Sequence, residues 1–284
     1  MKKGVVTIGM FDGVHIGHQK VLKTAVDYSK KNKAESVVLT FDNLPTKQKG
    51  SINTLDEKVK LIKSIGIKRI QIIKFNNVKN LTPKEFFNLF LKKYNSIIIG
   101  YNFKFGKNRE GHTEQIKRYC KNTIIVEPVK YRNIIVSSTN IKNLLLKGDI
   151  ESANNLLNRK YSFNGKVVGG YGWGKKLGFP TANIKVEKGK ILPEGIFISF
   201  TYLNKKRYNS VTYIGMRPTF NSRKISIETY ILGLSKSIYN KKIKVELISK
   251  IRDDKKFKFP EYLVEEIKKD IKKAERYFRN KRNI

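Results

Sequence analysis

The first 130 residues alternate between short β-branched runs and segments of helical periodicity. The runs are VVTIG, SVVLTF, RIQIIKF, SIIIGY and TIIVEPV, and the segments between them include QKVLKTAVDYSKK, LDEKVKLIKSI and TPKEFFNLFLKKY. Such alternation predicts parallel strands joined by helices. Because runs such as SIIIG are apolar throughout, helices are expected on both faces of the sheet. This part of the chain is therefore predicted to be α/β, with any ligand bound at the carboxyl ends of the strands.

The turn after the first run carries two of the chain's three histidines, His15 and His18. Gly9, Gly13 and Gly17 crowd the same turn, which indicates a close approach of the backbone to a ligand or positive φ angles. A strand, a tight turn and a helix start bring backbone N–H groups and the positive end of a helix dipole together, which suits a phosphate. Two imidazoles there suit nucleotidyl transfer, in which donors stabilise charge as pyrophosphate leaves. Two half-exposed polar residues at a helix start are the alternative interpretation.

Other side chains are predicted to share this edge of the sheet. Asp42 follows the second run, and Asn102, with Phe105 and Gly106, follows the fourth. Since parallel strands end at one edge, these loops converge with the histidine turn. Their convergence favours a ligand site more than any one loop does.

A Ser-Ser-Thr cluster, Ser137 to Thr139, precedes a helical run that stops at Gly148, and a second short helix is predicted after it. The hydroxyls predict a helix N-cap. Capping alone explains them, whereas a functional interpretation adds a bound phosphate at the same helix N-terminus.

After about Arg159 the pattern changes to short alternating segments between Gly and Pro residues. These segments are GKVVGG, GIFISFTYL, NSVTYIG, SIETYILGL and KIKVELISKI. Their spacing predicts a small antiparallel barrel. An amphipathic helix from about Pro260 to Arg279 is predicted to close the chain, with a lysine-rich face in solvent. Its predicted core-facing residues are Tyr262, Leu263, Ile267, Ile271, Ala274 and Phe278.

A second candidate site lies in this region. The segment GGYGWGKK resembles a Walker A loop but lacks the Ser or Thr after the lysine and sits among β segments, so a Walker A site is not expected. Beyond it, Thr181 and Asn183 follow Pro180 and offer small oxygen ligands that suit Mg²⁺ held against ATP phosphates. Glu228, among apolar neighbours, could take a proton from a hydroxyl nucleophile. An exposed strand carboxylate is the alternative interpretation of Glu228.

Composition limits the class of protein. The 284 residues suffice for two domains, and 39% hydrophobic residues support packed cores. The apolar run at the N-terminus breaks at Gly9, so neither a signal peptide nor a membrane span is expected, and a cytoplasmic location is predicted. The single Cys120 allows no internal disulfide and is predicted to be a buried or idle thiol.

The net charge of +37 is typical of proteins that bind nucleic acid or anionic membranes. The lysines, however, are scattered among Asn and Ile residues from end to end rather than gathered in one patch, which favours a solvated lysine surface. Nonspecific binding of RNA or DNA at low salt is the only nucleic-acid interaction expected.

With these segments in order, the chain resembles the prokaryotic bifunctional riboflavin kinase/FAD synthetase family along nearly its whole length. The matching segments are TIGMFDGVHIGHQ, TFDNLP, GYNFKFG, VSSTNIK, GKKLGFPTAN, LPEGIF, IGMRPTF, IETYIL and IRDDKKF. The resemblance implies a Rossmann-like nucleotidyltransferase domain with a parallel sheet, residues 1–158, that adenylylates FMN. It implies a six-stranded antiparallel β-barrel with a C-terminal helix, residues 159–284, that phosphorylates riboflavin.

The resemblance also implies the ligands. Mg²⁺ and ATP are expected, with riboflavin, FMN and FAD as substrate or product. The partners would be these small molecules, without a membrane or a specific nucleic-acid partner and with weak self-association at most.

Residue roles carry over from the family by position. His15 and His18 would hold ATP phosphates, and Glu228 would be the general base that activates the riboflavin 5′-hydroxyl. Thr181 and Asn183 would bind Mg²⁺ and ATP. Further ATP or phosphate contacts in the first domain would come from Gly9, Phe11, Asp12, Gly13, Gly17, Asn102, Ser138, Thr139 and Lys142. Further ATP or flavin contacts in the barrel would come from Gly174, Lys175, Gly178 and Pro180.

The chain departs from the family pattern mainly in the first domain. After the second strand the family often has Pro-His-Pro and a basic residue, whereas Leu44 lies within Asn-Leu-Pro-Thr here. Lys142 stands where Arg is usual, and Asn140 stands at another position that is often basic. Lysine keeps the charge but loses the planar fork that grips phosphate. A riboflavin kinase with an impaired adenylyltransferase domain is therefore an alternative.

The kinase segments are closer to the family pattern. Lys175 and Lys176 stand where Arg is frequent, and Trp173 is explained as a packing residue of that loop. A third hypothesis, motivated by the charge, is a basic RNA-associated flavin-binding regulatory protein, whose RNA affinity would fall steeply with salt.

Overall fold

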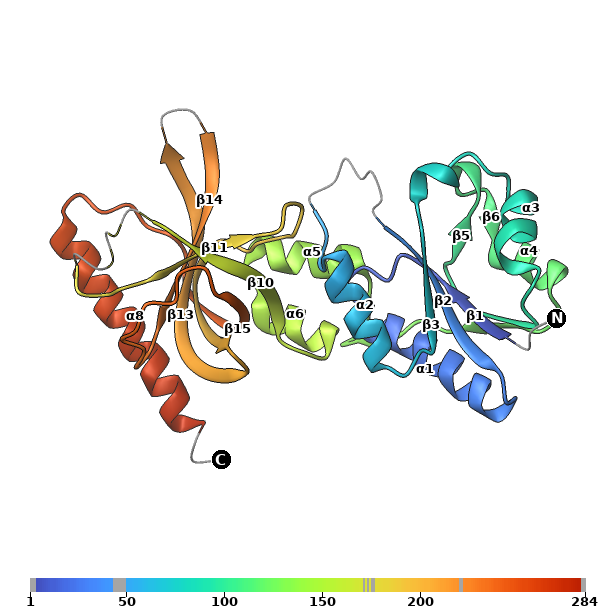
Figure 1. The fold of residues 1–284 in the computed structure, drawn as a ribbon, viewed down its shortest axis with the longest axis horizontal. Coiled ribbons are helices and arrows are strands. Elements are labelled where there is room, and N and C mark those ends of the chain that lie inside the picture. The colour runs from blue at the N-terminus through green and yellow to red at the C-terminus, as the bar shows by residue number, and fades with distance from the viewer. Residues whose placement is uncertain are drawn as a thin grey trace. The chain divides into compact units, whose positions relative to one another are not determined.

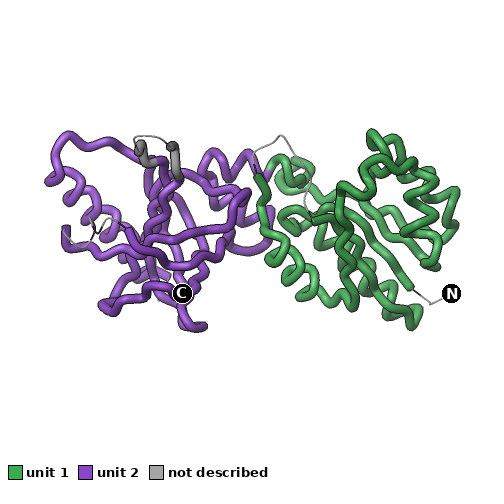
Figure 2. The backbone as a smooth tube through the Cα atoms, turned by 45° about the horizontal axis from the view of Figure 1, so that its top comes forward, with its two compact units in different colours: residues 1–140 green, residues 141–284 purple. Residues whose placement is uncertain are grey.

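A computed structural model describes residues 4–42, 50–170, 172, 174, 177–219 and 222–281. The chain forms two compact units, Met1–Asn140 and Ile141–Ile284, which Figure 2 shows in green and purple. Each unit has one of the two predicted architectures. The boundary expected between residues 158 and 159 separates the two predicted catalytic domains rather than the two compact units, and it stays a prediction.

Unit 1 is built on the predicted parallel sheet (Figure 1). Its strands are β1 (Gly4–Ile8), β2 (Glu35–Phe41), β3 (Arg69–Ile73), β4 (Ser96–Gly100) and β7 (Thr123–Val126). They lie in the order β3-β2-β1-β4-β7 and every pair is parallel. All five strands predicted from the apolar runs are confirmed. The turn after β1 therefore lies at the centre of the carboxyl edge.

Helices cover both faces of this sheet, as the apolar strands predicted. The helices α1 (Ile16–Lys31) and α2 (Leu55–Ser64) bury Leu22 and Ile62 against the face that carries Val5 and Val38. The opposite face is covered by α3 (Pro83–Phe86), the π-turn η2 (Phe87–Leu91) and α4 (Thr113–Tyr119).

The segment predicted as one helix over residues 82–94 contains this π-turn. Lys92 N donates to Phe87 O at 2.9 Å, and the wider turn brings Phe86, Phe87 and Leu91 to the buried side together.

Short elements complete unit 1. They are η1 (Phe75–Asn77), η3 (Lys107–Arg109), the hairpin of β5 (Lys104–Phe105) with β6 (Gly111–His112), and the hairpin of β8 (Lys130–Tyr131) with β9 (Ile134–Ile135). Phe105, which follows β4, is buried and its ring contacts Phe86 in the core of unit 1. Its part in the ligand site stays a prediction.

Two helices follow, as predicted: α5 (Ser138–Lys147), which begins in unit 1, and α6 (Ile150–Leu157). The Ser-Ser-Thr cluster does cap α5, since Asn140 N donates to Ser137 Oγ at 3.2 Å. In unit 2, Asn154 ties α6 to the barrel because its Nδ2 donates to Leu247 O at 3.0 Å and its Oδ1 accepts from Tyr161 N at 2.5 Å.

Unit 2 is the predicted antiparallel barrel, closed in the order β10-β11-β14-β13-β12-β15. Its strands are β10 (Tyr161–Val168), β11 (Ala182–Val186), β12 (Gly195–Leu203), β13 (Lys206–Thr219), β14 (Ser222–Ile231) and β15 (Lys242–Arg252). Sequence periodicity gives five of these strands. It misses β11, whose five residues, ANIKV, are too few to show alternation.

Part of the barrel core is polar. Ser199 Oγ lies 2.8 Å from both Ser210 Oγ and Thr212 Oγ1, and Thr212 Oγ1 lies 3.0 Å from Thr229 Oγ1. These hydroxyls are buried, and each forms a hydrogen bond with another hydroxyl of the group, which compensates the cost of their burial.

The predicted C-terminal helix is α8 (Pro260–Asn280). Ala274 and Phe278 pack against Ile196 and Ile198, which point outward from the barrel strand β12. Tyr262 does not join this core: it is 56% exposed and its ring contacts Phe259 instead, so its predicted burial is wrong. No helix among the residues given above is both long and apolar enough to cross a membrane.

A buried ion pair joins α8 to the end of β15. Arg252 Nη2 lies 2.8 Å from Asp270 Oδ2, and their side chains are 13% and 5% exposed. Removing one partner of such a pair leaves an uncompensated buried charge, so Asp270→Asn should cost about 3 kcal/mol of unfolding free energy. Urea denaturation followed by circular dichroism measures this loss. Lys269→Met, which breaks an exposed pair with Glu266 on the same helix, should cost less than about 1 kcal/mol; equal losses would contradict the assignment.

Candidate active sites

The two predicted histidines meet at the start of α1. His15 is the N-cap, and its Nδ1 accepts a hydrogen bond from His18 N at 3.3 Å. The rings stack with centroids 3.6 Å apart and planes 21° apart. Both imidazoles therefore lie where the helix dipole is positive, at the carboxyl end of the central strand β1.

The backbone of this turn is strained. Phe11 and Val14 have φ angles of 49° and 40°, which residues with a Cβ rarely adopt. At Gly17 an added Cβ would lie 3.2 Å from the His15 ring, and at Gly9 it would lie 3.2 Å from the Phe11 ring. Gly13, with φ 87°, completes the turn. Such strain persists where the surrounding structure enforces it, and it is common at ligand sites.

The surroundings of His18 disfavour the charged form of its imidazole. Burial, the neighbouring His15 and the more distant Lys58 together hold the pKa of His18 well below its usual 6.5. Its Nδ1 is buried and has no hydrogen-bond partner within the part of the chain that the structure describes, and its ring contacts Phe11 edge-on at a centroid distance of 5.3 Å. A negative ligand at this point would offset the repulsion from His15 and Lys58, which adds to the larger effect of burial on this pKa.

Other predicted residues of unit 1 collect around the same turn. Ser138 Oγ donates to Asp12 O at 2.8 Å, which brings the N-terminus of α5, with Thr139, to the histidine turn. The Asp12 carboxylate accepts from Ile52 N at 2.9 Å, so it ties the turn to the segment before α2. Asn102 is exposed just after β4, as predicted for a residue of the carboxyl edge. Lys142 lies farther along α5.

Asp42 directly follows β2, and its Oδ1 accepts a hydrogen bond from Phe75 N at 3.0 Å. This bond links the carboxyl ends of β2 and β3. The departures from the family at Leu44 and its neighbours, residues 43–46, fall outside the described residues.

Sequence reasoning missed Lys58 of α2. Its side chain is only 5% exposed, and its Nζ donates to Met10 O at 3.2 Å and to Phe41 O at 2.7 Å. Burial lowers its pKa from the usual 10.5 to about 8, although Asp12 and Asp42 oppose the shift. A signal was present, because Lys58 precedes the fully buried Ile62 by four residues and so shares its helix face.

The Lys58 pKa predicts a pH dependence of stability. Because the folded pKa of about 8 lies below the unfolded 10.5, the unfolded chain binds more protons between these pH values, and stability rises with pH there. The unfolding free energy of the wild type should gain roughly 3 kcal/mol relative to Lys58→Met between about pH 8 and 10.5. Urea denaturation of both proteins across this range measures the difference. A pH-independent difference would contradict the burial of a charged Lys58.

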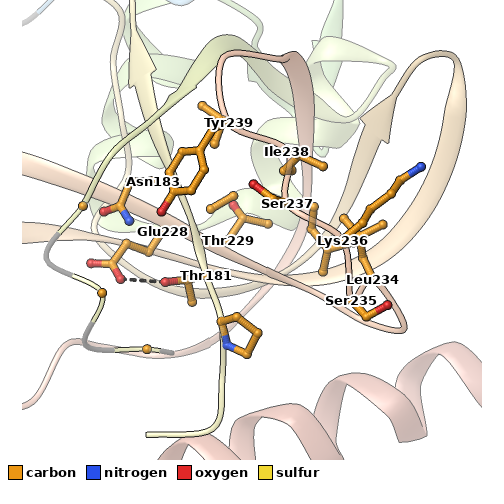
Figure 3. A pocket seen from close by; sticks show the side chains of 17 residues that line it. Thr181, Asn183, Glu228, Thr229, Leu234, Ser235, Lys236, Ser237, Ile238 and Tyr239 are labelled. Carbon is orange, nitrogen blue, oxygen red and sulfur yellow. Dashed lines mark hydrogen bonds between the residues drawn. The ribbon is translucent and has the colours of Figure 1, made fainter. Parts of the chain in front are cut away.

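The second candidate site is a pocket of about 250 Å³ in unit 2 (Figure 3). Thr181, Asn183 and Glu228 meet in it, as the resemblance implied. Residue Asn183 of β11 pairs with Glu228 of β14 in the sheet, and Thr181 Oγ1 donates to Glu228 Oε2 at 3.1 Å. Ser226 Oγ donates to the other carboxylate oxygen at 3.2 Å. Glu228 is thus a half-buried, oriented carboxylate rather than an exposed one.

A glycine-rich segment borders this pocket. A Cβ on Gly170 would lie 2.2 Å from Asn183 Nδ2, and one on Gly174 would lie 2.5 Å from Phe179 O. Gly178 has φ 85° and Pro180 lines the pocket. A side chain at Gly174 would clash with backbone, and one at Gly170 would displace the Asn183 amide from its place in the pocket. Lys175, Lys176 and Trp173 lie outside the described residues.

The opposite wall of the pocket was not predicted. The connection after β14, residues Leu234 to Tyr239, lines it with Ser235, Lys236 and Ser237. Figure 3 shows the Lys236 ammonium directed away from Glu228. The polar sequence LSKSIYN between two strands was the available signal, but it is also typical of an ordinary connection.

The oxygen donors of this pocket fit Mg²⁺ better than a softer metal. Thr181 and Asn183 offer a hydroxyl and an amide oxygen beside the Glu228 carboxylate. Within the described part of the chain, no three His, Cys, Asp or Glu side chains form a metal cluster. Such a small donor set suits Mg²⁺, which keeps several waters and is often held mainly by substrate phosphates.

Both halves of the chain match known protein families. Residues 1–140 match the FAD synthetase family, and residues 157–278 match the riboflavin kinase family. The chain is 36% identical to the bifunctional riboflavin kinase/FMN adenylyltransferase of Buchnera aphidicola subsp. Schizaphis graminum, over 96% of this chain and 93% of that protein. It is 33% identical to the enzyme of the same name from Bacillus subtilis, over 99% and 94%.

One solved structure matches nearly the whole fold. It is described as a macrolide-efflux protein from Streptococcus pneumoniae, and it aligns with a TM-score of 0.90 at 28% identity, over 96% of this chain and 94% of that chain. The likeness therefore extends over both units.

Proposed function

The chain belongs to the family of bifunctional riboflavin kinase/FMN adenylyltransferases, and on that premise we propose which residues carry each of its two reactions. The protein converts riboflavin to FMN and FMN to FAD, consuming ATP in each step. Because both halves match enzyme families, the alternative of a kinase alone is not favoured. We assign the kinase to residues 159–284 and the adenylyltransferase to residues 1–158.

In the kinase, Glu228 acts as the general base. It takes the proton of the riboflavin 5′-hydroxyl as that oxygen attacks the γ-phosphorus of ATP in line, and ADP leaves. The observation that carries this assignment is the hydrogen-bonded pair of Thr181 and Glu228 inside the pocket. With Thr181 and Ser226 each donating to one carboxylate oxygen, the orientation of the base is fixed before substrate arrives.

Mg²⁺ would be held by Thr181 and Asn183 together with the ATP phosphates. When bound, it neutralises the charge that develops on those phosphates. Gly170 and Gly174 leave the space beside these two residues open, so the protein contributes a preformed cradle for the polyphosphate.

In the adenylyltransferase, His15 and His18 hold the ATP phosphates at the N-terminus of α1. A phosphate oxygen of FMN attacks the α-phosphorus of ATP, the bond to the β-phosphate oxygen breaks, and pyrophosphate leaves. The two imidazoles and the backbone N–H groups of the turn stabilise the charge on the departing pyrophosphate. Ser138 and Thr139 bring a second helix N-terminus to the same phosphates, with Lys142 farther along that helix.

Partners and location follow the same proposal. The substrates are the small molecules of the two reactions, and a cytoplasmic location is expected. No specific nucleic-acid partner and at most weak self-association are expected, because the net charge is spread along the whole chain.

A chromatographic time course tests the proposal. Purified protein with riboflavin, ATP and Mg²⁺ should form FMN first and FAD later, and excess EDTA should stop both steps. Formation of FMN at an undiminished rate with EDTA would contradict the role of Mg²⁺ at Thr181 and Asn183.

A further inference from the structure

A buried lysine joins the two strand ends that flank the histidine site. Lys58 lies on α2, and its Nζ donates to the carbonyl oxygens of Met10 at 3.2 Å and Phe41 at 2.7 Å. Met10 is in the turn after β1, and Phe41 is the last residue of β2. One ammonium therefore bridges the carboxyl ends of two neighbouring strands.

Burial of an ammonium group in the protein interior is costly, and lysines are therefore almost never fully buried without a compensating partner. Lys58 is 5% exposed, and two neutral carbonyls accept its two hydrogen bonds. A methionine would fill similar space without a charge. A feature that costs stability and lies beside a site suggests a role in that site.

The bridge holds the strained part of the turn. Ile8 of β1 and Leu39 of β2 form the last pair of their ladder, and Gly9 N donates to Leu39 O at 3.1 Å just beyond it. Met10 precedes Phe11, whose φ is 49°, and Thr40 Oγ1 donates to the same Met10 carbonyl at 3.3 Å. These bonds to Met10 O fix the entry to the turn that carries the histidines.

A second contact joins the histidine turn to the segment before α2, because the Asp12 carboxylate accepts hydrogen bonds from Ile52 N and Asn53 N at 2.9 and 3.4 Å. The turn is thus tied to α2 and to the segment before it on both sides of Phe11. The titratable groups that face Lys58 are Asp12 from the turn, Asp42 from the end of β2 and His18 from α1. Its charge acts on His18, so its position affects the field at the phosphate site.

We propose that Lys58 is a positioning residue for adenylyl transfer: by bridging Met10 O and Phe41 O it sets the place of the histidine turn against the end of β2. The inference rests on the assignment of FMN adenylylation to unit 1. Without the bridge the turn relaxes, and the backbone N–H groups and imidazoles no longer meet the ATP phosphates together. Displacements of about 1 Å in such donors can cost about a hundredfold in rate.

The test compares three variants of the full chain. Lys58→Met removes the bridge. Lys60→Met removes an exposed lysine of the same helix, and Ile62→Val loosens the core under that helix without touching Met10 or Phe41. Initial rates of FAD formation from FMN are measured against ATP concentration at 15 °C. Riboflavin phosphorylation by the same preparations serves as the internal control.

Lys58→Met should lower kcat/KM for ATP in FAD formation by about tenfold to a hundredfold and raise KM for ATP. Its riboflavin phosphorylation should equal that of the wild type, and Lys60→Met and Ile62→Val should keep both activities. An unchanged KM for ATP with Lys58→Met, or an equal loss with Ile62→Val, would overturn the proposal, because either result is that of a merely structural residue. Absence of FAD formation by the wild type would instead contradict the function assigned to unit 1.

Discussion

Glu228→Gln should abolish FMN formation from riboflavin and leave FAD formation from supplied FMN intact. The substitution keeps the size of the side chain and its contact with Thr181, but the amide cannot accept the proton of the 5′-hydroxyl. Removal of a general base typically costs about 10²- to 10⁴-fold in rate, so kcat for FMN formation should fall by at least about a hundredfold. Chromatography of FMN and FAD after incubation with each substrate measures both effects.

The matched control is Glu187→Gln, an exposed carboxylate just after β11. It should keep both activities, since it lies outside the pocket lining. If Glu228→Gln phosphorylated riboflavin at the wild-type rate, Glu228 would be a structural strand residue. If it lost FAD formation as well while remaining folded, the division of the two activities between the units would be wrong.

His18→Ala should have the converse effect. Among the described residues its Nδ1 has no hydrogen-bond partner, so the substitution removes no hydrogen bond of that atom. Loss of one donor to a developing phosphate charge typically costs about 10²- to 10³-fold, and FAD formation from FMN should fall by that factor. Riboflavin phosphorylation, measured in the same preparation, should not change.

His15 needs a different substitution because it also caps α1. His15→Asn removes the imidazole but keeps a good N-cap, so it should lose FAD formation without loss of thermal stability. His112→Ala, at the third and exposed histidine, is the control and should keep both activities. Full FAD formation by His18→Ala and His15→Asn would show that the histidine pair does not bind ATP phosphates.

The fold was predictable where a local pattern decides it. The five parallel strands follow from runs such as SIIIG, whose uniform apolarity requires cover on both faces. The strand β11 was missed because closure of the barrel, rather than its own five residues, makes it a strand. Asp270 was missed because only the approach of Arg252 from β15 makes a carboxylate acceptable on the buried face of α8.

The sites, like the fold, were predictable from the sequence where a local motif carries them. The histidine pair is three residues apart, so a local motif reveals it. The meeting of Thr181 with Glu228 spans 47 residues and depends on the pairing of β11 with β14, and family resemblance rather than periodicity indicated it. The spacing of Lys58 from Ile62 places it on the buried face of α2, but its two carbonyl partners become evident only when the ends of β1 and β2 are in place.

The most direct test of the account is FAD formation by the unmodified protein from FMN, ATP and Mg²⁺, with riboflavin replacing FMN in a parallel sample. We predict that FAD appears in both samples and that FMN precedes it in the second. FMN from riboflavin without FAD in either sample would contradict the account, because the histidine turn, with Lys142 in place of arginine, would then not support adenylyl transfer.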